Sequence, residues 1–325
     1  MQPSDRIYIA GHRGLVGSAI MRSYQAAGYR NLLTLSHAEL ELTDHAAVRR
    51  FFERARPDHV ILAAARVGGI VANETYPAEF LHENLEIQNS VLHEAWRSGV
   101  KRLLFLGSSC IYPRDCPQPI KEEYLLTGPL EATNRAYAIA KIAGVEMCWS
   151  YNREYGCRYL AAMPTNLYGL GDNYDLEKSH VIPALIRKMH EAKTRTAAEV
   201  VVWGTGSPKR EFLYSEDAAD ACLHLLGMPE EGYRTLCESR SRPPLVNIGS
   251  GEDLTIRELA QAIAKVVGFD GRIVFDATKP DGTPRKLLDT SLLADLGWRH
   301  KTRLEDGLKL AYADFLKSHY AVATA

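Results

Sequence analysis

The sequence lacks the features that mark nucleic-acid-binding, secreted or membrane proteins. Its 39 Lys and Arg residues are balanced by 40 Asp and Glu residues, giving a formal net charge of −1. We therefore expect no nucleic-acid partner and no attraction to anionic membranes. No apolar run approaches the roughly 18 residues that a membrane-spanning helix needs. The first residues contain no basic stretch followed by an apolar one, so we expect a cytoplasmic rather than a secreted protein.

The cysteines also lack any special arrangement. None of the six forms a C-x-x-C pair, and none has the spacing of a zinc site. We therefore expect reduced thiols and no metal. The 325 residues, 46% of them hydrophobic and 24% charged, suffice for a large core in one or two domains.

Short apolar runs alternate with amphipathic segments in the first half of the chain. Runs that are apolar throughout favour parallel strands buried on both faces by helices. With right-handed crossovers, the result is a doubly wound, Rossmann-type α/β fold, whose ligands bind beyond the carboxyl ends of the strands. The predicted strands lie at 6–10, 32–35, 60–65, 101–106 and 159–163.

The regular pattern loosens after residue 164, although an apolar run at 245–248 resembles a strand that returns to the first sheet. We therefore predict a Rossmann domain that binds NADP and a smaller C-terminal α/β domain that binds substrate. The first comprises residues 1–168 with 214–250 returning to it, and the second comprises 169–213 and 251–325.

A glycine-rich turn follows the first predicted strand. Gly11, Gly14 and Gly17 permit a tight turn, a close approach of backbone to pyrophosphate, and close packing of helix on strand. The N–H groups and the positive end of the following helix favour phosphate. The alternative is a glycine-rich turn without a ligand. The predicted cofactor cradle consists of Gly11, His12, Arg13, Gly14, Leu15, Val16 and Gly17.

The choice between the two nicotinamide cofactors depends on the end of the second strand. NAD-binding proteins usually place an acid there for the ribose 2′-hydroxyl, but this chain has Leu35, Ser36 and His37. Arg13 in the glycine turn can meet a 2′-phosphate through a charge-assisted hydrogen bond. NADP(H) is therefore the favoured cofactor, with His37 as a weaker contributor; the alternative is that Arg13 is simply a solvated cation.

A serine, a tyrosine and a lysine have the order and spacing of a hydride-transfer site. Ser108 follows the fourth predicted strand, while Tyr137 and Lys141 lie one turn apart on one face of a helix. We expect the Lys141 ammonium to lower the pKa of the phenol from about 10. Tyr137 can then donate a proton to a nascent alkoxide, while Ser108 hydrogen bonds to the same oxygen. A Tyr/Lys pair on a solvated helix face is the alternative.

Several segments then resemble one family within the extended short-chain dehydrogenase/reductase superfamily, the GDP-L-fucose synthases. The most specific are Ser-Ser-Cys-Ile-Tyr-Pro at 108–113 and Ser-His-Val-Ile-Pro at 179–183. The similarity extends from residue 10 to beyond residue 280. The other similar segments are 11–17, 67–73, 164–169, 210–213 and 279–286.

The resemblance implies an enzyme that epimerises GDP-4-keto-6-deoxy-D-mannose at C3 and C5 and then reduces C4 with NADPH, giving GDP-L-fucose. It implies that Ser108, Tyr137 and Lys141 carry the reduction, with Lys141 also binding the nicotinamide ribose. Cys110 and His180 are implied as base and acid in the epimerisations. A thiol and an imidazole can both exchange protons near neutral pH. A packing role for Cys110 and a helix-start role for His180 are the alternatives.

The resemblance also implies contacts to the two ligands, although surface salt bridges remain an alternative for each lysine. The family commonly has arginine after its second strand, and its absence here weakens a strict preference for NADPH. The implied cofactor contacts beyond the cradle are His37, Leu106, Gly107, Lys141, Pro164, Thr165, Asn166, Leu167 and His180. The implied contacts to the GDP-sugar are Lys188, Trp203, Arg210, Asp281 and Lys286.

Two other functions fit parts of the pattern. A sugar-nucleotide 4-epimerase or 4,6-dehydratase would share the Tyr/Lys pair, but a dehydratase typically has a carboxylic acid near the catalytic serine. A non-catalytic NADP-binding regulatory protein would not need the complete Ser/Tyr/Lys set. Long helices near 78–99 and 134–156 predict a four-helix contact in a homodimer, as in relatives of this superfamily.

Overall fold

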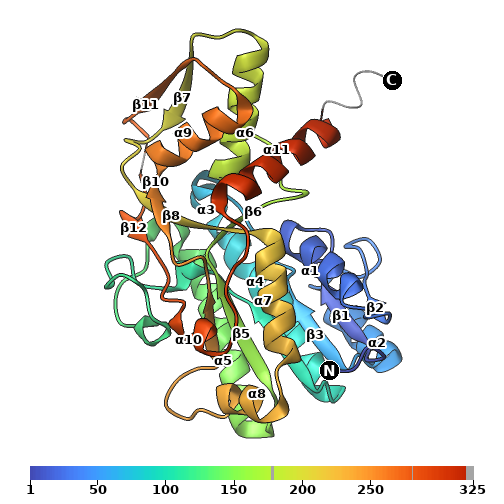
Figure 1. Ribbon diagram of the computed structural model, residues 1–325. Coiled ribbons are helices and arrows are strands. Elements are labelled where there is room, and N and C mark those ends of the chain that lie inside the picture. The colour runs from blue at the N-terminus through green and yellow to red at the C-terminus, as the bar shows by residue number, and fades with distance from the viewer. Residues whose placement is uncertain (177–178, 280, 320–325) are drawn as a thin grey trace.

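A six-stranded parallel sheet forms the centre of the larger part of the molecule (Figure 1). The computed structural model describes residues 1–176, 179–279 and 281–319. The strand order is β2-β1-β3-β4-β5-β9, so the chain winds outward in both directions from β1 and β3. The strands are β1 (Ile7–Ala10), β2 (Leu32–Leu33), β3 (His59–Leu62), β4 (Arg102–Leu106), β5 (Tyr159–Pro164) and β9 (Leu245–Ile248).

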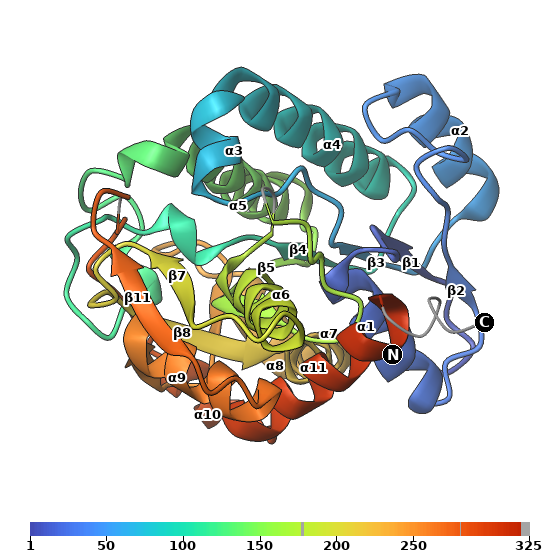
Figure 2. The ribbon, with the colours of Figure 1, turned by 90° about the horizontal axis from the view of Figure 1, so that it is seen from above.

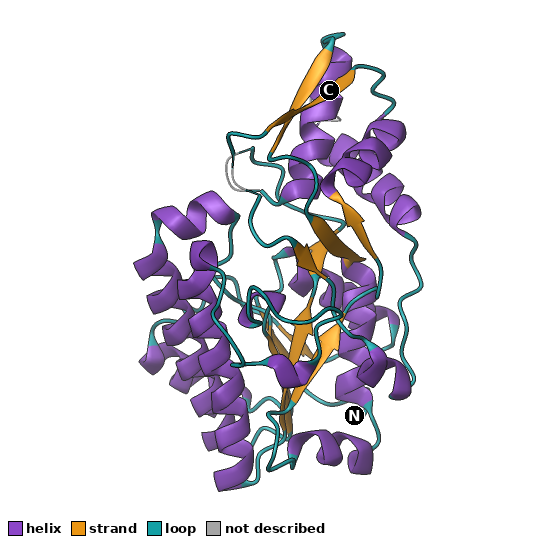
Figure 3. Ribbon diagram, turned by 90° about the vertical axis from the view of Figure 1, so that its left-hand side faces the viewer, coloured by secondary structure: helices purple, strands orange, loops and turns teal. Residues whose placement is uncertain are grey.

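Helices cover both faces of this sheet (Figure 3). Successive strand residues point to opposite faces: Leu103 and Phe105 pack against one helical layer and Leu104 against the other. Helices bury both faces of the sheet, which explains the uninterrupted apolar runs in the sequence. The first layer contains α2 (His45–Ala55), α4 (Pro77–Arg97) and α5 (Arg135–Tyr155), and the second contains α1 (Leu15–Ala26), α7 (Ser215–Gly227), α8 (Glu230–Cys237) and α10 (Ser291–Asp295).

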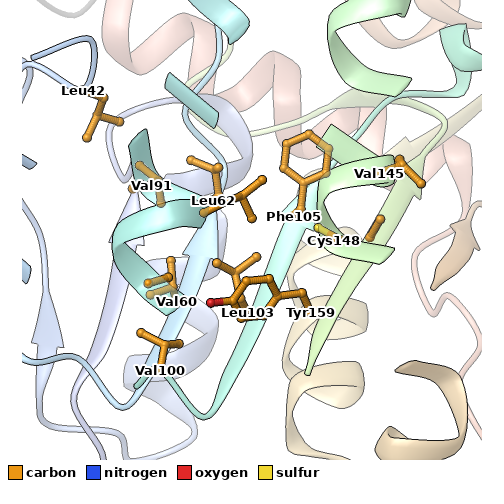
Figure 4. Packing of buried hydrophobic residues seen from close by; sticks show 14 of the residues in the cluster. Leu42, Val60, Leu62, Val91, Val100, Leu103, Phe105, Val145, Cys148 and Tyr159 are labelled. Carbon is orange, nitrogen blue, oxygen red and sulfur yellow. The ribbon is translucent and has the colours of Figure 1, made fainter. Parts of the chain in front are cut away.

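The core under the first layer positions α5, the helix that carries Tyr137 and Lys141. Val145 and Cys148 of α5 pack on Leu103, Phe105 and Tyr159 (Figure 4). The α5 backbone is therefore held against β4 and β5, and the first turns of α5 lie near the carboxyl ends of these strands. The Rossmann-type α/β fold predicted from the sequence is confirmed.

The smaller part of the molecule lies beyond the carboxyl ends of the main sheet, at the top of Figure 1 and also visible in Figure 2. It has its own apolar core. One sheet of this part consists of β6 (Asn166–Tyr168), β8 (Lys209–Tyr214), β10 (Asp253–Thr255) and β12 (Arg285–Lys286). A second sheet consists of β7 (Glu199–Trp203) and β11 (Arg272–Asp276). The helices that pack on them are α6 (Val181–Thr194), α9 (Ile256–Val267) and α11 (Leu304–His319).

The strand predicted at 245–248 joins the main sheet beside β5, as expected for a segment that returns to the first domain. The domain boundaries at 168, 213 and 250 stay a prediction. No helix within residues 1–176, 179–279 and 281–319 is long and apolar enough to cross a bilayer.

Two elements differ from expectation for local reasons. The long helix predicted near 78–99 is α4, and a separate short helix, α3 (Ile70–Thr75), precedes it; the two do not merge, because α4 begins at Pro77, which has no N–H to continue the first helix. The second strand has two residues rather than the predicted 32–35. After it, the Ser36 N–H donates to the Glu39 carboxylate at 2.7 Å instead of to a neighbouring strand.

Candidate active site

The glycine turn has the geometry of a dinucleotide cradle. Gly11 has φ of +87°, and a Cβ there would lie 2.6 Å from the backbone nitrogen of Ala64. A Cβ on Gly17 would lie 2.0 Å from the Gly11 carbonyl oxygen. Gly14 precedes α1 and has no side chain to cap it, so N–H groups of the first turn remain for a ligand. His12 Nδ1 is buried without a hydrogen-bond partner among the described residues. These residues fit a bound pyrophosphate.

Gly17→Ala tests this cradle. The new Cβ would displace the turn backbone, so we expect the free energy of unfolding to fall by about 1–3 kcal/mol and nicotinamide dinucleotide binding to weaken at least about tenfold. Gly227→Ala is the matched control, because Gly227 is also helical and has nothing within 4 Å of its Cβ position. Calorimetric titration and urea unfolding measure both effects. Unchanged binding in Gly17→Ala would contradict a cradle that requires close helix packing.

The end of β2 carries mixed charges. Glu39 accepts hydrogen bonds from the hydroxyl and the backbone N–H of Ser36, and both bonds lower the pKa of its carboxyl group. The nearby Arg13 and His12 lower this pKa further. The predicted contributor His37 is 88% exposed and pairs with Glu41 at 2.7 Å. Arg13 interacts electrostatically with Glu39 at this strand end, and its contact with a 2′-phosphate stays a prediction.

The Ser/Tyr/Lys set gathers at the carboxyl end of β4. The buried Lys141 Nζ donates to the carbonyl oxygen of Leu106 at 2.8 Å and lies 5.8 Å from the centre of the Tyr137 ring. Ser108 follows β4 directly, and its hydroxyl accepts a hydrogen bond from the backbone N–H of Cys110 at 3.3 Å. Gly107 is held by a bond from its N–H to the Ala162 carbonyl. The set predicted from spacing is brought together in space.

The electrostatics of the Tyr137–Lys141 pair differ from expectation. Burial raises the pKa of Tyr137, and nearby Cys110 adds to the rise, while a side-chain hydrogen bond with Ser108 opposes it. Burial lowers the pKa of Lys141 to about 7. The expected lowering of the phenol pKa by Lys141 is therefore wrong for the chain by itself. A lysine that is half neutral near pH 7 supplies little field to stabilise a phenolate.

Cys110 lies among hydrogen-bond donors and cations. Asn134 Nδ2 approaches its sulfur at 3.1 Å, and Lys286 Nζ lies 3.7 Å away. Burial lowers the pKa of Arg210, and the electrostatic interaction of Arg210 with Cys110 opposes this lowering. The thiol is partly accessible. Lys286, predicted only as a substrate contact, therefore also lies beside the thiol.

His180 lies at the start of α6, and its side chain makes no capping hydrogen bond to the helix. Its side chain is exposed, and desolvation by the surrounding protein lowers the pKa of the imidazole. It is therefore mostly neutral near pH 7. The preceding Ser179 is close to Gly69, because a Cβ on Gly69 would lie 3.5 Å from the Ser179 carbonyl oxygen. The similar segments 67–73 and 179–183 thus meet in the fold.

The segment from Pro164 to Leu167 links the two parts of the molecule. Thr165 Oγ1 and Asn166 Nδ2 both donate to the backbone carbonyl of Glu211, at 3.2 and 2.8 Å. The Glu211 carboxylate is fully buried and accepts bonds from the Gly251 and Leu288 N–H groups. This buried carboxylate, which we did not predict as a site residue, connects the predicted cofactor segment to the strand that carries Arg210.

Two of the predicted substrate contacts, Lys188 and Trp203, lie together, while Asp281 and Arg210 contact each other. Trp203 is 52% exposed and lies under Lys188 Nζ at 5.0 Å and Lys279 Nζ at 5.6 Å. Asp281 accepts two hydrogen bonds from Thr205, both at 2.8 Å, and its carbonyl accepts one from Arg210 at 3.2 Å. Lys279 was missed, although it begins a segment already singled out at 279–286.

Other hollows are separate from this cluster. A cavity beside α7 is lined by Asp220, His224, Trp298 and Arg299, and an adjoining one reaches Ser250 and His300. None of the predicted site residues lines either cavity. Within the described residues no group of His, Cys, Asp and Glu side chains is arranged to hold a metal ion.

A doubly wound sheet, a glycine cradle and a Ser/Tyr/Lys set at the strand ends are the features of a nicotinamide-dependent oxidoreductase of the short-chain dehydrogenase/reductase type. The model of the NAD dependent epimerase/dehydratase family matches residues 7–249. GDP-L-fucose synthase 1 of Arabidopsis thaliana is 56% identical over 315 residues, which cover 97% of this chain and 94% of that protein. The GDP-L-fucose synthase of Escherichia coli K12 is 54% identical over 316 residues, which cover 97% of each.

A solved structure agrees with these relatives. The GDP-L-fucose synthetase of Naegleria fowleri bound to NADP has a TM-score of 0.85 and 29% identity, with 100% of this chain and 97% of that one covered. The chain therefore belongs to the NAD dependent epimerase/dehydratase family, in the group formed by the GDP-L-fucose synthases and their relatives. The resemblance seen in the sequence is confirmed.

Proposed function

We propose that this protein is a bifunctional GDP-L-fucose synthase. It epimerises GDP-4-keto-6-deoxy-D-mannose at C3 and C5 and then reduces the C4 ketone with NADPH. Two curated relatives with that name, more than half identical over nearly the whole chain, support the substrate class. The observation that carries the proposal is the grouping of Cys110 with Ser108 and Tyr137 beyond β4, because the two chemistries need one shared site.

NADP(H) is the proposed cofactor, in keeping with the NADP-bound relative. When bound, NADPH supplies the hydride. The glycine turn would hold its pyrophosphate and Arg13 its 2′-phosphate. Lys141 uses one N–H for the Leu106 carbonyl, so its remaining donors would reach the nicotinamide ribose.

In the reduction, Tyr137 donates its phenolic proton to the oxygen at C4. Its raised pKa keeps this proton in place at neutral pH, so the side chain is an acid rather than a base. Ser108 hydrogen bonds to the same oxygen as negative charge develops on it. The two groups need no movement between steps, because an enolate and an alkoxide at C4 place charge on the same atom.

In the epimerisations, Cys110 and His180 exchange protons at the carbons beside the ketone. One takes a proton from C3 or C5, leaving the electron pair in the enolate, and the other delivers a proton to the opposite face. The neutral imidazole of His180 and the thiolate form of Cys110 can each accept a proton. The diphosphate of the substrate would meet Lys188, Lys279 and Arg210 through charge-assisted bonds.

The alternative functions have less support. A 4,6-dehydratase needs an acid beside Ser108 to protonate a leaving hydroxyl, and this chain has Cys110 there. A regulatory NADP-binding protein would not need a complete Ser/Tyr/Lys set. Consumption of NADPH in stoichiometry with product separates the proposed function from both.

The assembly we infer is a cytoplasmic homodimer formed through α4 and α5. These helices pack side by side on one face of the sheet, and Tyr155 and Ile139 of α5 are exposed apolar side chains on them. Two such pairs can form a four-helix contact. Light scattering should give the mass of two chains, and a monomer at micromolar concentration would contradict this assembly.

The proposed function is tested by supplying GDP-4-keto-6-deoxymannose with NADPH and determining the stereochemistry of the product. GDP-L-fucose, with one NADPH oxidised per product, is the expected result. A product reduced at C4 but unchanged at C3 and C5 would identify a simple 4-reductase instead.

Cys110→Ser tests the epimerisation step. A serine hydroxyl is a much weaker base than a thiolate, so we expect deuterium uptake from solvent at C3 and C5 to slow at least about a hundredfold, while binding of the GDP-sugar is retained. NMR measures the uptake. Cys157→Ser is the control, because this partly exposed thiol follows α5 at the opposite end from Asn134. Wild-type exchange in Cys110→Ser would remove Cys110 from the mechanism.

A further inference from the structure

Asn134 stands where an asparagine gains little for the fold. It ends the 3-10 turn Ala132–Asn134 and directly precedes α5, and its side chain makes no capping hydrogen bond to the helix. The cap of this turn is supplied instead by Glu131, whose carboxylate accepts from the Thr133 N–H. Asparagine is a poor residue within helical segments and is usually favoured for its capping bond. That bond is absent here, so helix capping does not explain the residue.

The carboxamide of Asn134 faces Cys110 instead. Its Nδ2 approaches the sulfur at 3.1 Å, whereas its Oδ1 is buried without a hydrogen-bond partner in the described residues. Buried amide oxygens are nearly always paired. The amide nitrogen therefore donates to the sulfur, and the amide oxygen remains free to accept a hydrogen bond once the sulfur carries a proton.

The charged and titratable groups around the sulfur come from three elements. Lys286 of β12 lies 3.7 Å from it. Tyr137 of α5 and Arg210 of β8 both interact with it electrostatically. The two cations can only donate, and Tyr137 is assigned to the C4 oxygen, whereas Asn134 is uncharged, contacts the sulfur directly and can either donate or accept a hydrogen bond.

We propose that Asn134 is a positioning residue that holds Cys110 in both of its protonation states; this inference rests on the proposed role of Cys110 as a base. The Asn134 N–H stabilises and aims the thiolate toward the sugar carbon. Proton transfer breaks the C–H bond, forms the S–H bond and leaves the electron pair in the enolate. Rotation of the carboxamide then lets Oδ1 accept the new S–H. A carboxylate in the same place would only accept, and alanine would do neither.

The test uses Asn134→Asp and Asn134→Ala in the full chain. Iodoacetamide alkylation of Cys110 is followed from pH 6 to 9.5 by peptide mass spectrometry. A negative charge next to the sulfur should slow alkylation at pH 7 about tenfold or more in Asn134→Asp, and loss of the donor should slow it about threefold in Asn134→Ala. Deuterium exchange at C3 and C5 should fall in the same order. The thermal stability of Asn134→Asp should be unchanged or higher, because a carboxylate near a helix N-terminus is favourable.

A purely structural role gives a different pattern. Thr255→Ala removes the capping box of α9, remote from Cys110, and should lower stability without changing alkylation. If Asn134→Asp alkylates Cys110 at the wild-type rate across the pH range, the proposal is overturned. The alkylation result does not depend on the reaction. If Cys110→Ser kept wild-type exchange while Asn134→Asp slowed alkylation, the proposed role of Cys110 would fail but the contact would stand.

Discussion

Tyr137→Phe should reduce the rate of NADPH-dependent ketone reduction about a thousandfold, within the range measured for removal of a general acid. The phenol is the proton donor to the C4 oxygen, and phenylalanine keeps its ring while removing that proton. The ring packs edge-on to Phe80, with centroids 6.3 Å apart, so we expect this variant to fold normally. Deuterium exchange at C3 and C5 should persist in part, because Ser108 still hydrogen bonds to the enolate oxygen.

The two activities are measured separately, as NADPH absorbance for reduction and NMR for exchange. Tyr155→Phe is the control, because Tyr155 lies on the same helix but is half exposed at its far end. Full reductase activity in Tyr137→Phe would contradict the assigned proton donor. Loss of both activities to the same extent would place the phenol in the enolisation as well, and would exclude Ser108 as a sufficient donor to the enolate.

The main sheet could be predicted because its signals are local. The strands around 103–106 and 159–163 are apolar throughout, and burial on both faces requires this pattern. The glycine turn could be predicted for the same reason. Gly11 and Gly17 are required because a Cβ there would collide with residues nearby in sequence or with the end of the neighbouring strand.

The smaller sheet could not be predicted in detail, because its pairing is remote in sequence. β8 pairs with β6, β10 and β12, which come from three distant segments, and β12 has only Arg285 and Lys286. Such short strands leave no periodic pattern. β7 is the exception, because the apolar run Val200–Trp203 indicates a strand from the sequence alone.

The candidate site divides in the same way. Motif spacing located Ser108, Tyr137 and Lys141, but gave no reason to expect Asn134 beside Cys110, 24 residues earlier. Glu211 is fully buried and binds groups 40 and 77 residues away, a role that no local pattern indicates. The pKa of Lys141 was missed because it depends on burial, and burial depends on the complete fold.

That burial leads to a second large effect, in Lys141→Met. The pKa of Lys141 is about 7 in the folded chain, whereas lysine in an unfolded chain titrates near 10.4. Between pH 7 and 10 the unfolded state therefore binds more protons than the folded state, and the free energy of unfolding should rise with pH on account of this group. At pH 7 and below, the ionised amine is more stable in the unfolded chain than in its buried site, so Lys141 destabilises the folded, ligand-free protein.

Methionine has a similar length and no charge to desolvate, so Lys141→Met should be more stable than the wild type by about 2–4 kcal/mol at pH 7. This difference should shrink steadily toward pH 10, while the reductase rate falls at least about a hundredfold. Urea unfolding at pH 6.5, 7.5, 8.5 and 9.5 measures the trend.

Lys265→Met, at a lysine that is 78% exposed, should show no such trend. A difference that stayed constant with pH, or a less stable variant, would mean that Lys141 is ionised and satisfied in the folded chain. A Lys141→Met variant that is more stable but less active would show that the amine beside the Leu106 carbonyl serves the chemistry and not the stability of the fold.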